Sequence, residues 1–73
     1  MTETFVFTQP RDRDIFLRAV AERFASVLTA TPEIETGTGR LLVRIDFDHA
    51  GTRSPVFQAD FAAFVRTMGG VKA

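Results

Sequence analysis

The chain has 73 residues, nine basic and nine acidic side chains, one histidine and no cysteine. A chain of this length forms one domain, and the lack of cysteine excludes disulfide bonds and thiolate metal sites. The zero net charge argues against a nucleic-acid binder, because phosphate contacts normally require a basic excess.

The apolar stretches are short, well below the roughly 20 residues that span a bilayer. The N-terminus has no basic segment followed by an apolar run, which is the pattern of a signal peptide. We therefore expect a cytoplasmic protein that has no contact with a membrane.

The first predicted strand covers residues 3–8, which are rich in β-favouring side chains and end before Pro10. A helix is predicted from Pro10 to Leu28, because proline fits the first turn of a helix and the apolar residues then recur with helical spacing. Thr31-Pro32 marks the predicted end of that helical pattern. The predicted inner stripe consists of Phe16, Leu17, Val20, Ala21, Phe24, Val27 and Leu28.

Residues 33–36 predict a short second strand, and the glycines of residues 37–39 predict a turn. Residues 40–48 predict the clearest strand of the chain, because apolar and mostly charged residues alternate along it. This alternation is typical of a sheet with one buried and one solvated face. The predicted buried positions are Leu41, Val43, Ile45 and Phe47.

The last predicted helix begins after Ser54, a favourable N-cap residue, and ends at Met68 before two glycines. Its large apolar residues share one face, which must cover something apolar. These residues are Phe57, Phe61, Phe64, Val65 and Met68.

This order of elements predicts an α+β fold, in which residues 1–73 form one two-layer sandwich of order β-α-β-β-α. We expect a three-stranded antiparallel sheet of order 1-3-2 with both helices on one face. The arrangement resembles a ferredoxin-like unit that lacks its last strand. The second face of the sheet is either solvated or a self-association patch, and we expect a monomer or weak homodimer. That face would carry Val6, Leu42, Arg44, Asp46 and Asp48.

The segment 46–54 holds the residues most suited to chemistry. Asp46, Asp48 and His49 offer metal ligands, but the sequence supplies no further ligand or second shell. His49 and Asp48 are neighbours on a strand and so point to opposite sides, which is unsuitable for an acid–base pair. Residues 51–54 precede a helix N-terminus, where an anion can bind or where an ordinary helix start can lie. We predict no catalytic residue, metal or cofactor.

The run Ile45-Asp46-Phe47, followed by Ser54-Pro55-Val56-Phe57, is similar to the strand-to-helix junction of STAS-like domains. The similarity covers less than a third of the chain, which lacks the additional strands and helices of such domains. It implies a protein-binding role, since STAS-like domains bind protein partners in bacterial regulation.

Our hypothesis is a non-enzymatic protein-binding module that modulates or inhibits a larger host assembly, for example the transcription machinery. In size it is similar to the small regulators of phages and mobile elements. The first strand, predicted at a sheet edge, would pair with a partner, and a charged helix entrance would set partner choice. The predicted partner-binding residues are Thr2, Glu3, Thr4, Val6, Arg11, Asp12, Arg13 and Asp14. The alternative is a nucleic-acid-binding accessory protein with an arginine patch of Arg40, Arg44 and Arg53.

Overall fold

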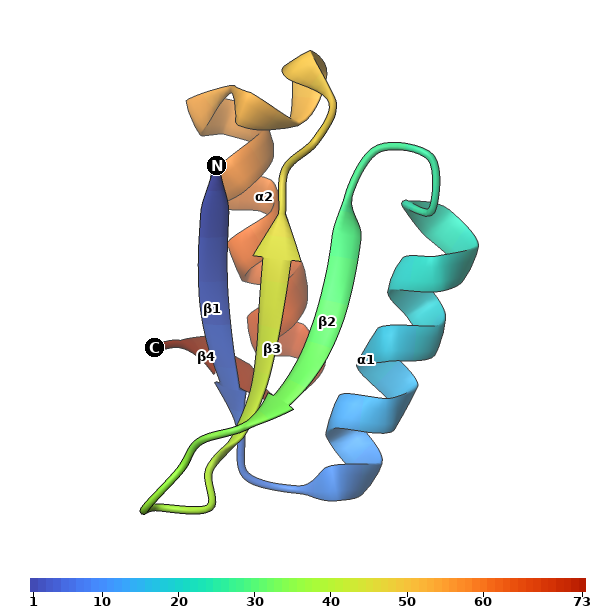
Figure 1. Ribbon diagram of the computed structural model, residues 1–73. Coiled ribbons are helices and arrows are strands. Elements are labelled where there is room, and N and C mark those ends of the chain that lie inside the picture. The colour runs from blue at the N-terminus through green and yellow to red at the C-terminus, as the bar shows by residue number, and fades with distance from the viewer.

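The computed structural model describes residues 1–73, whose elements follow one another in the order β-α-β-β-α-β (Figure 1). The four strands form one antiparallel sheet of order β2-β3-β1-β4. The elements are β1 (Thr2–Phe7), α1 (Pro10–Arg23), β2 (Thr29–Ile34), β3 (Leu41–Asp46), the short 3-10 helix η1 (Ala50–Arg53), α2 (Pro55–Thr67) and β4 (Gly70–Lys72). The α+β class is confirmed, and the relative order of the first three strands is as predicted. The prediction of a three-stranded sheet is wrong.

The additional strand is β4, which pairs with β1 along Phe5–Phe7. The β1 strand therefore lies inside the sheet, and the prediction that it forms an edge is wrong. The topology is the complete ferredoxin-like one, with its last strand present.

Gly69 adopts a φ of +97°, which turns the chain out of α2. Gly70 then passes so close to the Phe7 ring that a Cβ atom would lie 2.6 Å from it.

The boundary between α1 and β2 also differs from the prediction. The helix ends at Arg23 rather than at Leu28, and β2 covers residues 29–34 rather than 33–36. Leu28 still belongs to the core, but it reaches the core from the connecting loop. Pro32 lies within β2, opposite Val43. The β2 strand has a neighbour on one side only. The backbone nitrogen of Pro32, which carries no hydrogen, can therefore face the free edge without the loss of a hydrogen bond between strands.

Both helices cover the same face of the sheet, as predicted. The α1 and α2 helices each contribute buried side chains to one cluster that also contains alternate residues of β1 and β3. Because successive strand residues point to opposite faces, these alternate residues mark one buried side of the sheet. The cluster consists of Phe5, Phe7, Phe16, Val20, Leu28, Val43, Ile45, Phe47, Phe61 and Val65.

The α2 helix agrees closely with its prediction. The Ser54 side chain accepts a hydrogen bond from the Phe57 N–H at 3.1 Å, which caps the helix. Phe61 and Val65 are buried, and the other predicted inner residues pack partly buried against the core. Neither α1 nor α2 has the length and apolar character that crossing a bilayer would require.

Candidate functional site

The face of the sheet opposite the helices is not covered by any element, and we call it the open face. Its residues follow from the strand register, because directly opposed residues of antiparallel strands point to the same side. The open face consists of Thr2, Thr4, Val6, Thr29, Thr31, Glu33, Leu42, Arg44, Asp46 and Val71.

Three apolar residues form a row across the open face. Val71 on β4 lies opposite Val6 on β1, and Val6 in turn lies opposite Leu42 on β3. Val71 is 55% exposed, while Val6 and Leu42 are half-buried although no other element covers them. We call these three residues the apolar row. They place adjacent hydrophobic surface on a part of the molecule that faces solvent.

The polar part of the open face is internally paired. The Arg44 guanidinium lies 2.8 Å from the Glu33 carboxylate and 3.9 Å from the Asp46 carboxylate. Asp46 also accepts a hydrogen bond from the Thr2 hydroxyl at 2.7 Å. One arginine and two carboxylates give this face a formal charge of −1. Each charged side chain of this face therefore already has a neighbour of opposite charge.

The structure divides the predicted partner-binding residues of β1 between the two faces of the sheet. Thr2, Thr4 and Val6 lie on the open face, beside β3. Glu3 points to the helix side, where its carboxylate lies 3.6 Å from the Lys72 ammonium. The backbone of β1 is paired with β3 along its whole length and with β4 from Phe5 onward, which leaves little free edge for strand addition.

The predicted helix entrance lies at the other end of β1 from Thr2 (Figure 1). Arg11 and Asp14 are exposed there, while Asp12 and Arg13 are half-buried. The Asp12 carboxylate faces the turn at Gly69. The Arg13 guanidinium lies near its neighbour Asp14 at 3.7 Å. The structure thus does not join the entrance and the N-terminal half of β1 into one surface.

The three arginines of the alternative prediction are also separated. Arg40 lies in the β2–β3 hairpin and Arg53 in η1, at opposite ends of the sheet (Figure 1). Arg40 donates to both carboxylate oxygens of Glu35 at 2.8 Å. Arg53 donates to two backbone carbonyls of the β3–η1 connection, and Arg44 is paired on the open face. These arginines form no common patch for phosphates.

The segment 46–54 forms a compact turn. The Nδ1 atom of His49 accepts a hydrogen bond from the Gly51 N–H at 3.1 Å, and the buried Thr52 hydroxyl donates to the His49 carbonyl at 2.6 Å. The Asp48 carboxylate accepts from the Thr29 hydroxyl at 2.7 Å. No group of three or more His, Cys, Asp or Glu side chains is placed to hold a metal ion. The Ser54 side chain caps α2 within the segment where anion binding was left open.

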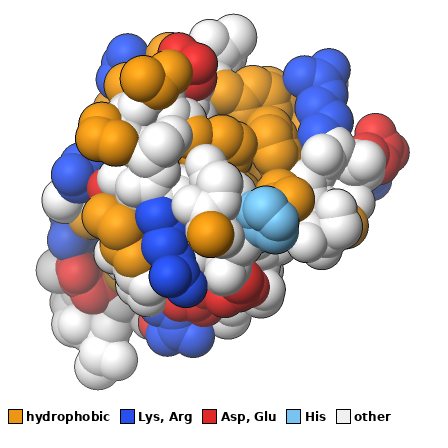
Figure 2. Space-filling model, turned by 90° about the horizontal axis from the view of Figure 1, so that it is seen from above, with side chains coloured by type: hydrophobic (Ala, Val, Ile, Leu, Met, Phe, Trp, Pro, Cys, Tyr) orange, Lys and Arg blue, Asp and Glu red, His pale blue; other side chains and the backbone are white.

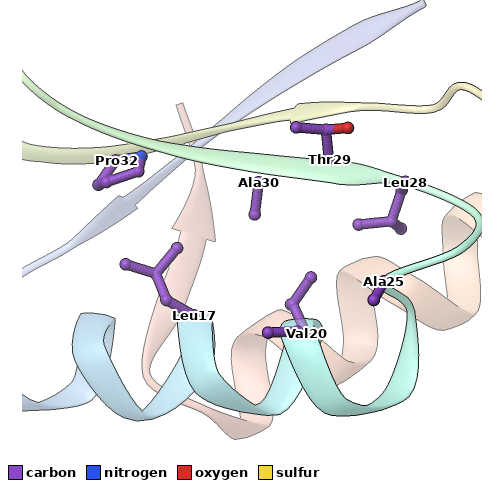
Figure 3. Close-up of a pocket in the computed structure, with 8 residues that line it drawn as sticks. Leu17, Val20, Ala25, Leu28, Thr29, Ala30 and Pro32 are labelled. Atoms are coloured by element: carbon purple, nitrogen blue, oxygen red, sulfur yellow. The ribbon is translucent and has the colours of Figure 1, made fainter.

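Sequence reasoning missed the three cavities of the structure, two of which are lined mainly by apolar residues. The larger, of about 410 Å³, lies between α1 and the edge strand β2, where Leu17 and Val20 point toward Ala30 and Leu28 (Figure 3). Its lining is almost entirely apolar and brings no ionisable groups together. It could not be found from the sequence, because residues 28–32 were predicted to end a helix rather than to begin a strand. The smaller cavity lies between Phe24 and α2.

No protein-family model matches the chain, and no curated protein or solved structure matches it significantly. The similarity to STAS-like domains is therefore not supported by a family match.

Proposed function

We propose that this protein is a non-enzymatic protein-binding module whose interface is the open face, and that its binding modulates or inhibits a larger assembly. The observation that carries the proposal is the apolar row on an uncovered sheet. Hydrophobic side chains that lie together on an accessible surface are typical of interaction sites. The partner would be a protein with an apolar patch that fits this row.

The same face favours a protein partner over a nucleic acid. Sheets that bind single-stranded nucleic acids use aromatic rings on which the bases stack. All eight phenylalanines of this chain belong to the core or pack against it, so the open face has no aromatic ring. Its formal charge of −1 also offers phosphates no attraction.

The residues with catalytic potential have structural roles. His49 caps η1, Asp48 accepts a hydrogen bond from Thr29, and the charges of the open face pair with one another. Acid–base or nucleophilic catalysis requires such groups to converge on a substrate position. This arrangement supports a binding role.

A pair of matched variants tests the proposal. Partners are captured from a host lysate with the tagged protein, and the binding of each purified partner is then measured by isothermal titration calorimetry. Val71→Glu places a carboxylate in the apolar row, and burying that charge should weaken binding at least about tenfold. Val56→Glu is the control, because Val56 is 73% exposed on α2, away from the open face. Equal binding by both variants would overturn the assignment.

A gel-shift assay covers the alternative function. The proposal predicts no complex with single- or double-stranded DNA or RNA at low salt. A complex that weakens steeply as salt increases would instead favour nucleic-acid binding, and it would contradict the proposed function.

A further inference from the structure

The smaller cavity, of about 260 Å³, is walled almost entirely by phenylalanine rings. It is lined by Phe24, Phe57, Asp60, Phe61 and Phe64. Phe24 follows α1, and the other four residues lie on one face of α2. Figure 2 shows hydrophobic side chains gathered in a hollow at this end of the molecule, with basic and acidic side chains at its margin. We call this cavity the aromatic pocket.

The Phe24 ring stands at a steep angle to two other rings of the aromatic pocket. Phe24 is nearly perpendicular to Phe57, at 87° and a centroid distance of 6.1 Å, and nearly perpendicular to Phe61, at 81° and 5.5 Å. Phe57 and Phe61 are stacked at 14°. Phe24, Phe57 and Phe64 remain half-buried rather than fully buried, so part of each ring is accessible. The lining therefore contains accessible aromatic surface, and the faces of aromatic rings carry partial negative charge.

The single polar residue of the lining is Asp60. It is exposed, lies three residues after Phe57 and four before Phe64, and therefore shares their face of α2. None of the molecule's ion pairs involves Asp60. A carboxylate without a cationic partner thus stands at the margin of an aromatic cavity.

One cation already contacts this cluster. The guanidinium carbon of Arg23 lies 5.7 Å from the centroid of the Phe64 ring, within the distance of a cation–π interaction. Phe64 therefore stands where a positive charge can approach its ring. Arg23 is exposed at the end of α1, so its side chain can move away from Phe64.

From these observations we propose that the aromatic pocket binds a quaternary ammonium group. The aromatic rings attract the cation through their faces, and Asp60 adds a full negative charge. A quaternary ammonium group suits the pocket because it has no N–H groups, and the lining offers only Asp60 as a side-chain hydrogen-bond acceptor. The volume admits a trimethylammonium group but is below the range of about 300–1,000 Å³ typical of drug-sized ligands.

The test is an NMR titration of the folded, isotope-labelled protein with choline and, in parallel, with Nε-trimethyllysine. Both carry the same trimethylammonium group, and the tighter of the two identifies the source of the natural ligand. The neutral control is 3,3-dimethyl-1-butanol, which has the shape of choline without its charge. We expect chemical-shift changes centred on residues 57–64, with binding at least about fivefold weaker for the neutral control.

Two surface variants should shift the affinity in opposite directions. Asp60→Asn removes the attracting charge and should weaken choline binding about fivefold, whereas Arg23→Gln removes a competing cation and should strengthen it. Asp14→Asn is the matched control, because Asp14 is an exposed carboxylate at the far end of α1 and should leave the affinity unchanged. All three substitutions are at exposed positions, so the variants should fold.

The proposal is overturned if neither trimethylammonium compound shifts the pocket signals, or if the neutral control binds as tightly as choline. Equal affinities of the wild type, Asp60→Asn and Arg23→Gln would also overturn it. In those cases the cavity is an apolar hollow without charge selectivity.

Discussion

Glu35 is the residue whose ionisation the structure changes most. Hydrogen bonds from Arg40 and then from Thr38 lower the pKa of its carboxyl from an ordinary 4.5 to about 2. A carboxylate with a depressed folded-state pKa adds stability at neutral pH, and this contribution is lost as the pH falls from 4.5 through about 2. The pair is exposed, so salt should screen the effect.

We therefore predict that Arg40→Gln raises the pKa of Glu35 toward its ordinary value. An NMR titration of the side-chain carboxyl carbons measures this directly, and Arg44→Gln serves as the control because Arg44 pairs with Glu33 instead. A wild-type midpoint near 4.5 would contradict the hydrogen-bonded arrangement of the hairpin.

Gly70 is required by space rather than by its backbone angles. A Cβ atom at this position would lie 2.6 Å from Cζ of Phe7 and 2.7 Å from Cγ1 of Val65, and both of these side chains are fully buried. Gly70→Ala should therefore lower the free energy of unfolding by about 1–3 kcal/mol, the usual cost of overpacking. Urea denaturation measures the change. Val71→Ala, next in the same strand but exposed, should change it by only about 0.5 kcal/mol.

At the scale of elements, the two helices begin differently. Ser54 caps α2 through its side chain, whereas Gln9 precedes α1 in an extended conformation with no side-chain cap. Gln9→Ser should therefore stabilise the protein, by up to about 1 kcal/mol, because serine can accept a hydrogen bond from the first turn. Thermal unfolding followed by circular dichroism measures the gain. Ser54→Ala, the converse change, should cost about 0.5–2 kcal/mol, and a loss of stability in Gln9→Ser would contradict the argument.

The elements also show what can be predicted from this sequence. The alternation in residues 40–48 and the spacing in α2 each have one interpretation, so β3 and α2 were predicted to within one or two residues of their bounds, and their inner faces were assigned correctly. Val27 and Leu28 continue the helical spacing of α1, although they lie in the loop that follows it. They are apolar because Leu28 belongs to the core and Val27 packs against it. The length of α1 was overestimated for this reason.

The β4 strand and the sites that depend on tertiary structure could not be predicted in the same way. Gly69-Gly70 signals the end of a helix, and three following residues are too short to show alternation. Val71 therefore went unnoticed, although Val6 and Leu42 were placed correctly on the second face of the sheet. The aromatic pocket depends on how Phe24 meets α2, which local patterns do not determine.

At the scale of the whole molecule, Phe61 connects the layers. Its ring centroid lies between 5.5 and 6.1 Å from those of phenylalanines in both helical regions and on the buried side of the sheet. These neighbours are Phe5, Phe16, Phe24, Phe47, Phe57 and Phe64. Removing this one ring therefore opens space next to both the helices and the buried side of the sheet.

We predict that Phe61→Ala does not fold. Truncating a buried phenylalanine to alanine costs about 3–5 kcal/mol, and a single core in a domain of this size rarely supplies more than about 3–5 kcal/mol in total. The amide signals of Phe61→Ala in an NMR spectrum should show the narrow dispersion of an unfolded chain. Phe61→Leu keeps most of the volume and should fold with reduced stability. A cooperative unfolding transition of Phe61→Ala close to that of the wild type would show that the layers are held together elsewhere.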